Sequence, residues 1–164
     1  LSELVTEIPS FKNDLELKLI GAVSQEVLKT ISKYNLDSYL NILGYVSHKE
    51  AVSHQRTSQI LLLIEINSDN TKSILPGKLF EYMVSERPII AIGPKDSDFA
   101  EIIKSTNTGV FFTYDEKEAL KTLITSHYNL FLQQNLKVFP VGLQDYSRKN
   151  LTQNLAKLIT SSWE

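Results

Sequence analysis

The strongest constraint on the fold is an alternation of short apolar runs with segments of helical periodicity. The run 59–66 is almost continuously apolar, and the run 88–93 repeats this character after one intervening helical segment. Parallel strands show such runs because helices cover both faces of their sheet. Further elements are expected in the same alternation, namely strands at 15–21, 40–46 and 109–113 and helices at 24–34, 48–56, 98–105 and 117–134. This order predicts an α/β fold with a doubly wound, Rossmann-like parallel sheet.

Both ends of the chain carry helical patterns. Leu1, Leu4, Val5 and Ile8 lie on one helical stripe with no initiator Met and no N-cap residue before them, so we expect the chain to start inside a helix and to be a piece of a longer protein. Residues 135–145 are expected to be irregular. A closing amphipathic helix is expected at 146–162, with its apolar face formed by Leu151, Leu155, Leu158 and Ile159.

Composition narrows the class of protein. The chain has 164 residues, of which 42% are hydrophobic and 22% charged, as expected for one globular domain. A net charge of −2 argues against a nucleic-acid partner. The absence of cysteine excludes disulfides, a thiol nucleophile and cysteine-ligated zinc. Neither a signal peptide nor an apolar run of about 18 residues is visible, so a cytoplasmic location is expected.

The segment 75–83 has the most informative residue pattern. Pro76 is tolerated only just before a helix or in its first turn, so it marks where a helix begins. Leu79, Phe80, Met83 and Val84 then recur at the spacing of a buried helical stripe. The polar residues Lys78, Glu81 and Ser85 are expected on the opposite, solvated side of that helix.

Lys78 and Glu81 together are suited to a nucleotide. A lysine at a helix start can bind phosphate, and a carboxylate one turn further can accept hydrogen bonds from hydroxyl groups. Phosphate beside hydroxyls describes a nucleoside diphosphate with its ribose. The alternative is an ordinary pair on a solvated helix face, which contributes only about 0.2–0.5 kcal/mol.

Several segments in the same order resemble the C-terminal domain of family 4-like, group 1 glycosyltransferases. The motif Pro-x-Lys-x-x-Glu-Tyr at 76–82 is the most specific of them, and the others are 44–51, 87–94, 100–103 and 146–152. Such enzymes have the GT-B fold, in which two Rossmann-like domains face each other across a cleft. The resemblance implies that residues 1–164 are the domain that holds the nucleotide-sugar donor, without the N-terminal acceptor domain.

The resemblance also implies roles for individual residues. Tyr45, Val46 and Ser47 would lie along the nucleotide base, largely through backbone groups. The diphosphate and sugar would be bound by Ser73, Gly77, Lys78 and Leu79, with Lys78 stabilising the leaving diphosphate, and Glu81 would hold the ribose hydroxyls. Without the resemblance, Tyr45 is better explained as a half-buried strand aromatic. No metal and no cofactor other than the donor substrate are expected.

Two departures from the family pattern affect the expected chemistry. Many members place a glutamate eight positions before the ribose-binding one, but that position is Ser73 here, so the stereochemical outcome is left open. The glycine-rich turn after the first strand of the domain is also missing. A sugar-nucleotide epimerase of the same architecture and a non-catalytic nucleotide-sugar-binding module are the alternative functions.

The expected partners are the nucleotide-sugar donor and a glycan or lipid-linked acceptor, with peripheral membrane association of the full-length enzyme. If the central first strand precedes this chain, the strands 15–21 and 59–66 lose a shared neighbour. They would then pair directly with each other, or a second copy would cover the gap in a homodimer.

Other polar clusters are assigned structural roles. The sequence Asp96-Ser97-Asp98 resembles a metal-binding Asp-x-Asp motif, but its position favours a helix N-cap with acidic first-turn residues. His48, His54 and His127 lack metal-ligand spacing and are interpreted as surface or packing histidines.

Overall fold

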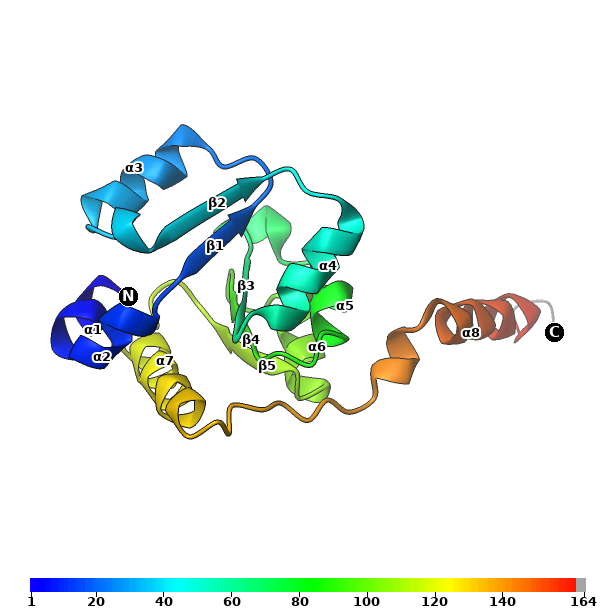
Figure 1. The fold of residues 1–164 in the computed structure, drawn as a ribbon. Helices are drawn as coiled ribbons and strands as arrows, with labels where there is room; N and C mark the ends of the chain where they lie inside the picture. The colour runs from blue at the N-terminus through cyan, green and yellow to red at the C-terminus, as the bar shows by residue number, and fades with distance from the viewer. Residues whose placement is uncertain (162–164) are drawn as a thin grey trace. The chain divides into compact units, whose positions relative to one another are not determined.

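The computed structural model describes residues 1–161 and has an α/β fold in which every strand pairing is parallel (Figure 1). The elements in chain order are α1 (Ser2–Glu7), α2 (Pro9–Asp14), β1 (Leu17–Ile20), α3 (Gln25–Lys33), η1 (Asp37–Tyr39), β2 (Leu40–Gly44), α4 (His48–Thr57), β3 (Leu61–Ile64), η2 (Asp69–Thr71), α5 (Lys78–Met83), β4 (Ile89–Ile92), α6 (Asp98–Ser105), β5 (Gly109–Phe112), α7 (Lys117–Leu132), η3 (Leu143–Tyr146) and α8 (Arg148–Ser161). The chain divides into two compact units. Unit 1 comprises Leu1–His54 and Lys117–Leu136, and unit 2 comprises Gln55–Glu116 and the described residues from Lys137 onward.

The sheet of unit 1 has two strands. β1 and β2 pair in parallel, with Leu17 opposite Leu40, and the pairing shifts between Leu19 and Ile20. The backbone N–H of Gly21 extends the pairing by donating to the Gly44 carbonyl at 2.7 Å. Both glycines have positive φ, +102° and +65°, which glycine adopts without the steric cost of a side chain.

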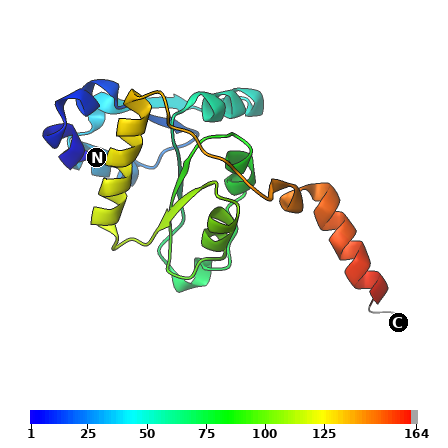
Figure 2. The same cartoon turned by 90° about the horizontal axis from the view of Figure 1, so that it is seen from below.

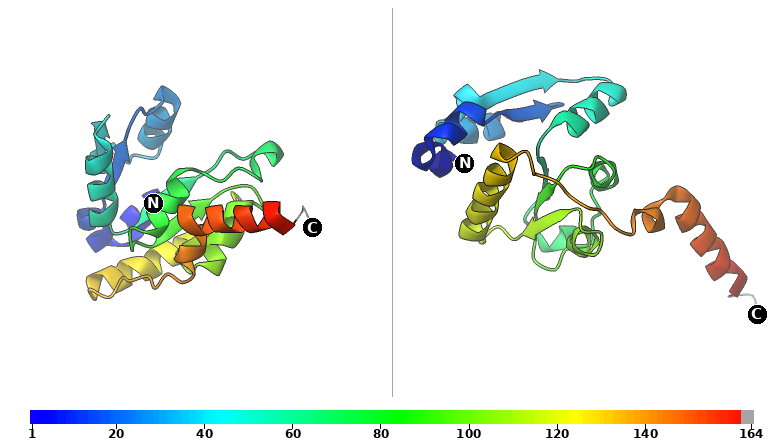
Figure 3. Two further views of the ribbon diagram at one scale, coloured as in Figure 1. Left: turned by 90° about the vertical axis from the view of Figure 1, so that its right-hand side faces the viewer. Right: turned by 60° about the horizontal axis from the view of Figure 1, so that its bottom comes forward.

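The helices α1, α2 and α7 of unit 1 enclose a small apolar core (Figure 3). Its buried members are Leu4, Phe11 and Tyr128. The rings of Phe11 and Tyr128 meet edge to face with their centroids 5.0 Å apart. The Tyr128 hydroxyl donates to Asp14 Oδ2 at 2.6 Å, so the polar end of this buried ring has a partner.

Ion pairs tie α1 to α7 on the surface of unit 1. Glu3 pairs with Lys117 and, at 3.0 Å, with Lys121, which also contacts Glu7 at 2.6 Å. Hydrogen bonds from Lys117 and then Lys121 lower the pKa of Glu3 from 4.5 to about 2. Because Glu3, Glu7 and Lys117 are exposed, solvent screens the pairs and their contribution to stability is small.

The sheet of unit 2 has the strand order β3-β4-β5. Leu61 lies opposite Ile89, and Ile89 lies opposite Gly109, so the three strands are in register at their starts. The helices α5 and α6 lie beside this sheet (Figure 2). The core between helices and sheet consists of Leu63, Leu79, Met83, Ile89, Ala91, Phe99 and Ile103. The strand pairing needs a glycine at 109, because a Cβ there would stand 2.0 Å from the Ile89 carbonyl oxygen.

The predicted α/β class, the parallel strands and their positions are confirmed, but the strands form two sheets. Among the described residues β1 pairs with β2, and β3 pairs with β4. The strands 15–21 and 59–66 belong to different units, so the expectation that they pair directly with each other stays a prediction. The alternative, that a second copy covers the gap, stays a prediction.

Predictions around α5 need two corrections. Val84 was assigned to the buried stripe, but α5 ends at Met83 and Val84 is 55% exposed. Ser85 was placed on the solvated side and is buried. Its hydroxyl donates to the Tyr82 carbonyl at 2.6 Å and accepts from the Arg87 N–H at 3.2 Å, which satisfies it in the turn after the helix.

The predicted closing helix over 146–162 is confirmed as α8, which begins at Arg148 after the turn η3. The turn η3 packs against the core of unit 2 through Leu143 and Tyr146, and α8 then runs from Arg148 to Ser161. Residue 162 lies outside the described residues. All four side chains of the predicted apolar face of α8 are exposed: Leu151, Leu155, Leu158 and Ile159.

Candidate functional site

The loop from β3 to α5 in unit 2 is stabilised by hydrogen bonds and leads to the first group of predicted site residues. The Thr71 hydroxyl lies 2.7 Å from the Ile66 carbonyl and 2.8 Å from the Ser68 carbonyl, and the Asp98 N–H donates to the Lys72 carbonyl at 2.9 Å. Ser73 and Gly77 follow on this loop, Lys78 is the first residue of α5, and all three are exposed. Because the loop leaves the carboxyl end of β3, these residues lie on the side of the sheet where α/β proteins bind ligands.

At the start of α5, an exposed lysine is followed directly by a buried leucine. Pro76 precedes the helix as predicted, and its carbonyl accepts from the Leu79 N–H at 2.9 Å. The Lys78 side chain is exposed and makes no ion pair within residues 1–161. The Leu79 side chain is fully buried in the core. Leu79, which was predicted to bind the donor, could therefore contact a ligand only through its backbone.

Glu81 lies one turn after Lys78 and is partly buried. Its Oε2 accepts a hydrogen bond from Gln55 Nε2 at 3.1 Å, from the unit 2 part of α4. The neighbouring Tyr82 has a raised pKa, chiefly because it is buried and secondarily because of the Glu81 charge. Glu81 is thus a carboxylate that another side chain orients.

The second group of predicted residues follows β2 in unit 1. Tyr45 is 88% exposed, so the alternative interpretation as a half-buried strand aromatic is wrong. It comes directly after Gly44, whose positive φ turns the chain at the end of the strand. A largely exposed aromatic ring is uncommon in a fold with a core to fill, and it offers a stacking surface to a planar ligand.

Ser47 has a structural task at the start of α4. Its backbone N–H and hydroxyl donate to Glu50 Oε2 at 2.8 and 2.7 Å, and its hydroxyl oxygen accepts from the Glu50 N–H at 3.3 Å. This is a capping box. Hydrogen bonds from the Ser47 side chain and then its backbone lower the pKa of Glu50. The residues 45–47 thus belong to unit 1, whereas Ser73, Gly77, Lys78, Leu79 and Glu81 belong to unit 2.

Sequence reasoning missed a hollow of about 360 Å³ at the carboxyl ends of β3, β4 and β5, which we call the β3–β5 hollow. It is lined by Asn67, Gly93, Lys95, Thr113, Tyr114 and Asp115. Hydrogen bonding to the Thr113 hydroxyl, which also lies 2.8 Å from Glu116 Oε2, and to its own backbone N–H lowers the pKa of Asp115, and the charge of Lys95 acts in the same direction. The available signal was the polar residues that directly follow three apolar strands.

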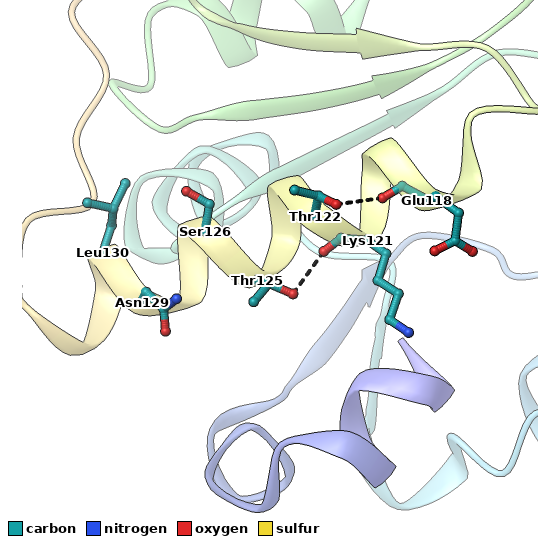
Figure 4. Close-up of a pocket in the computed structure, with 7 residues that line it drawn as sticks. All are labelled: Glu118, Lys121, Thr122, Thr125, Ser126, Asn129 and Leu130. Atoms are coloured by element: carbon teal, nitrogen blue, oxygen red, sulfur yellow. Dashed lines mark hydrogen bonds between the residues drawn. The ribbon is translucent and has the colours of Figure 1, made fainter.

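A second hollow runs along one face of α7 in unit 1 (Figure 4). Thr122 and Thr125 on this face donate their hydroxyls to the Glu118 and Lys121 carbonyls of the same helix, at 2.9 and 3.0 Å. His127 lies elsewhere on α7, and burial lowers its pKa. Its Nδ1 is buried without a hydrogen-bond partner among the described residues, as expected of a packing histidine.

The Asp96-Ser97-Asp98 segment has the predicted place at the start of α6. Ser97 occupies the N-cap position, and Asp98 and Glu101 supply acidic residues in the first turn. The Ser97 hydroxyl does not cap the helix but donates to the Pro94 carbonyl at 2.5 Å. In residues 1–161 no three His, Asp or Glu side chains gather as a metal site would require.

Comparison with known proteins gives one family. The family described as "Glycosyl transferases group 1" matches residues 1–129. This range contains all the predicted site residues, from Tyr45 to Glu81, and the β3–β5 hollow. No curated protein matches the chain. None of the helices in residues 1–161 has the length and apolar character needed to cross a membrane.

Proposed function

Because the chain belongs to the group 1 glycosyl transferases, we propose that it binds a nucleoside-diphosphate sugar and presents it for transfer to a hydroxyl acceptor. The acceptor in this proposal is a glycan or a lipid-linked saccharide that a second domain of the enzyme holds. The chain shares this role with the donor-binding half of a GT-B enzyme.

The observation that carries the proposal is the pair Lys78 and Glu81 at the start of α5. Lys78 is an exposed cation with no ion-pair partner in residues 1–161, and Glu81 is a partly buried carboxylate oriented by Gln55. An ammonium group only donates hydrogen bonds and a carboxylate only accepts them. The pair therefore complements a diphosphate that is followed by ribose hydroxyls.

Transfer forms a bond between the acceptor oxygen and the anomeric carbon, and the acceptor hydroxyl gives its proton to a base that the acceptor-holding domain would supply. The bond from the anomeric carbon to the diphosphate oxygen breaks, and negative charge accumulates on that oxygen. Lys78 would stabilise this charge as the bond breaks. The exposed Ser73 hydroxyl lies on the same loop and could donate to the sugar or to a phosphate oxygen. Ser73 has no carboxylate, so the proposal assigns no nucleophilic role to this position.

The base would lie against the segment after β2. Tyr45 offers an exposed ring, and the backbone groups of Tyr45 and Val46 supply donors and acceptors. The side chain of Ser47 is already committed to Glu50, and its carbonyl accepts from the Ala51 N–H at 2.9 Å. Ser47 could therefore contact the ligand only through the second lone pair of that carbonyl.

Calorimetry with uridine and guanosine diphosphates tests the proposal. Losing one hydrogen bond to a charged group costs about 1.5–3 kcal/mol, which corresponds to roughly tenfold or more in affinity. We therefore expect Lys78→Ala and Glu81→Gln each to weaken binding of the better diphosphate by about tenfold.

The matched controls are Lys104→Ala and Glu101→Gln, which change exposed residues of the same types on α6. Both should bind with the affinity of the unmodified chain. Unchanged affinity in both test variants, or an equal loss in test and control variants, would contradict the site assignment.

A further inference from the structure

We propose that the β3–β5 hollow is a sugar subsite, which holds a pyranose ring of the donor or of the acceptor glycan. This inference rests on the proposed transferase function and adds to it a second binding place, separate from Lys78 and Glu81. The inference depends on three polar side chains that line the hollow, and these come from three different loops: Asn67, Lys95 and Asp115.

The position of the hollow favours a ligand site. Asn67 follows β3, Gly93 and Lys95 follow β4, and Thr113, Tyr114 and Asp115 follow β5. Carboxyl ends of parallel strands meet at one edge of their sheet, where open α/β sheets bind ligands. The structure thus gathers there six residues from three loops that are far apart in the sequence.

Hydrogen bonds hold these loops together in the absence of any ligand. The Glu65 N–H donates to the Ile92 carbonyl at 2.9 Å, and the Gly93 N–H donates to the Phe112 carbonyl at 3.1 Å. The Tyr114 hydroxyl donates to the Glu65 carbonyl, which links the loop after β5 to the loop after β3. Little ordering cost therefore remains for binding.

The floor of the hollow is fixed by Gly93. A Cβ at this position would stand 2.7 Å from Phe99 Cζ and 3.3 Å from Phe111 Cε2, so a side chain cannot be accommodated without displacing the core. The aromatic side chains beneath Gly93 meet edge to face with their centroids 5.3 Å apart. The hollow consequently sits on rigid core packing.

The polar groups match the hydrogen-bonding pattern of a sugar. The Asp115 carboxylate accepts, the Lys95 ammonium donates, and the Asn67 amide does both. Neither Asn67 nor Lys95 makes a side-chain hydrogen bond to another described residue. Sugar hydroxyls both donate and accept, so one ring can engage all three groups. The Tyr114 ring, 45% exposed, offers an apolar surface to the C–H side of the sugar.

Charge and size argue against a phosphate group or a large ligand. Lys95 and Asp115 have opposite charges, so the hollow carries no net attraction for an anion, and the Asp115 carboxylate would repel a phosphate. A volume of about 360 Å³ lies near the lower end of the roughly 300–1,000 Å³ typical of ligand sites. A single neutral sugar ring satisfies both limits.

The test compares Lys95→Ala and Asp115→Asn with the control Lys104→Ala. Calorimetry measures the affinity for UDP, GDP, UDP-glucose and GDP-mannose, and saturation-transfer NMR measures contact with free glucose, galactose and mannose. If the subsite holds the donor sugar, each test variant binds the nucleotide-sugar about tenfold more weakly, the loss expected for one hydrogen bond to a charged group, and binds the diphosphate unchanged.

If the subsite holds the acceptor sugar, nucleotide-sugar affinity is unchanged, and the saturation transfer to free monosaccharides is lost in both test variants but kept in Lys104→Ala. The inference is overturned if neither variant alters any sugar signal, if the unmodified chain shows no sugar contact at all, or if both variants weaken the diphosphate as much as the nucleotide-sugar.

This design separates the two proposals. If the unmodified chain does not bind a diphosphate, the proposed donor site is wrong. The saturation-transfer experiment with free monosaccharides still tests whether the hollow binds a sugar. Conversely, Lys78→Ala should lower the diphosphate affinity and leave the saturation transfer to monosaccharides in place.

Discussion

Replacing Leu79 by alanine tests whether this residue of the donor-binding motif stabilises the fold. The Leu79 side chain is 0% exposed and lies in the core of unit 2 with Leu63, Met83 and Phe99. Replacing a buried leucine by alanine removes apolar contacts and leaves a cavity, at a typical cost of about 2–5 kcal/mol. For Leu79→Ala we expect the upper half of this range, about 3–5 kcal/mol, because backbone of both α5 and β3 would have to move to close the cavity.

Urea unfolding followed by circular dichroism at 222 nm measures this loss, and Tm should fall by roughly 6–15 °C. The matched control is Leu155→Ala on α8, where the side chain is 57% exposed. We expect that control to change the free energy of unfolding by less than about 0.5 kcal/mol. A loss below about 1 kcal/mol for Leu79→Ala would refute the assignment of this side chain to the core.

Three further changes follow from individual contacts. Ser47→Ala removes the capping box of α4 and should lower the unfolding free energy by about 1 kcal/mol in urea titrations, while Ser47→Asp should restore most of it. Because the lysines of α7 depress the pKa of Glu3 from 4.5 to about 2, the ionised form stabilises the fold above pH 4.5 and this stabilisation is lost as the pH falls toward 2. Glu3→Gln should therefore flatten the decline of Tm over that pH window at low salt, and 1 M salt should remove the difference. Gly109→Ala places a Cβ 2.0 Å from the Ile89 carbonyl and should abolish cooperative unfolding, whereas Gly77→Ala, with nothing within 4 Å of its Cβ, should leave Tm unchanged or slightly higher.

Periodicity and turn residues were sufficient to predict most elements of the chain. The apolar runs 59–66 and 88–93 became β3 and β4, and Pro76 marked the start of α5. These signals are local, since apolar runs favour strands and proline restricts where a helix can begin. The expectation that both faces of the strand are covered fails for β3, where Leu62 and Ile64 are 51% and 57% exposed. The family assignment rested on the same segment and is confirmed by the match to residues 1–129.

Two kinds of feature could not be predicted from the sequence: the exact ends of helices, and the residues that come together only in the folded chain. Val84 continues the helical stripe in sequence, but α5 ends at Met83 and leaves it exposed. The separate helix α2 was not predicted, because Pro9 starts it immediately after the Ile8 that ends the first stripe. The β3–β5 hollow brings together Asn67, Lys95 and Asp115, and only the sheet register places them at one edge.

The candidate site was only partly readable for the same reason. Lys78 and Glu81 fall on one helix, so their spacing was visible in the sequence. The orientation of Glu81 by Gln55 is visible only in the structure, whereas the capping role of Ser47 had a signal in the Ser-x-x-Glu pattern at 47–50, which sequence reasoning missed. The exposure of Tyr45 was also not predictable, because an aromatic residue at a strand end is more often half buried.

The most direct test of donor binding is to map the amides that respond to a nucleoside diphosphate. Backbone ¹H–¹⁵N spectra of the uniformly labelled chain would be recorded during titration with UDP and with GDP. We predict that the largest shift changes occur at residues 73–81 and at Tyr45–Ser47, and that Lys78→Ala abolishes them at the same ligand concentration. Shift changes confined to the polar face of α7, at residues 118–130, or no response to either diphosphate at millimolar concentration, would contradict the account.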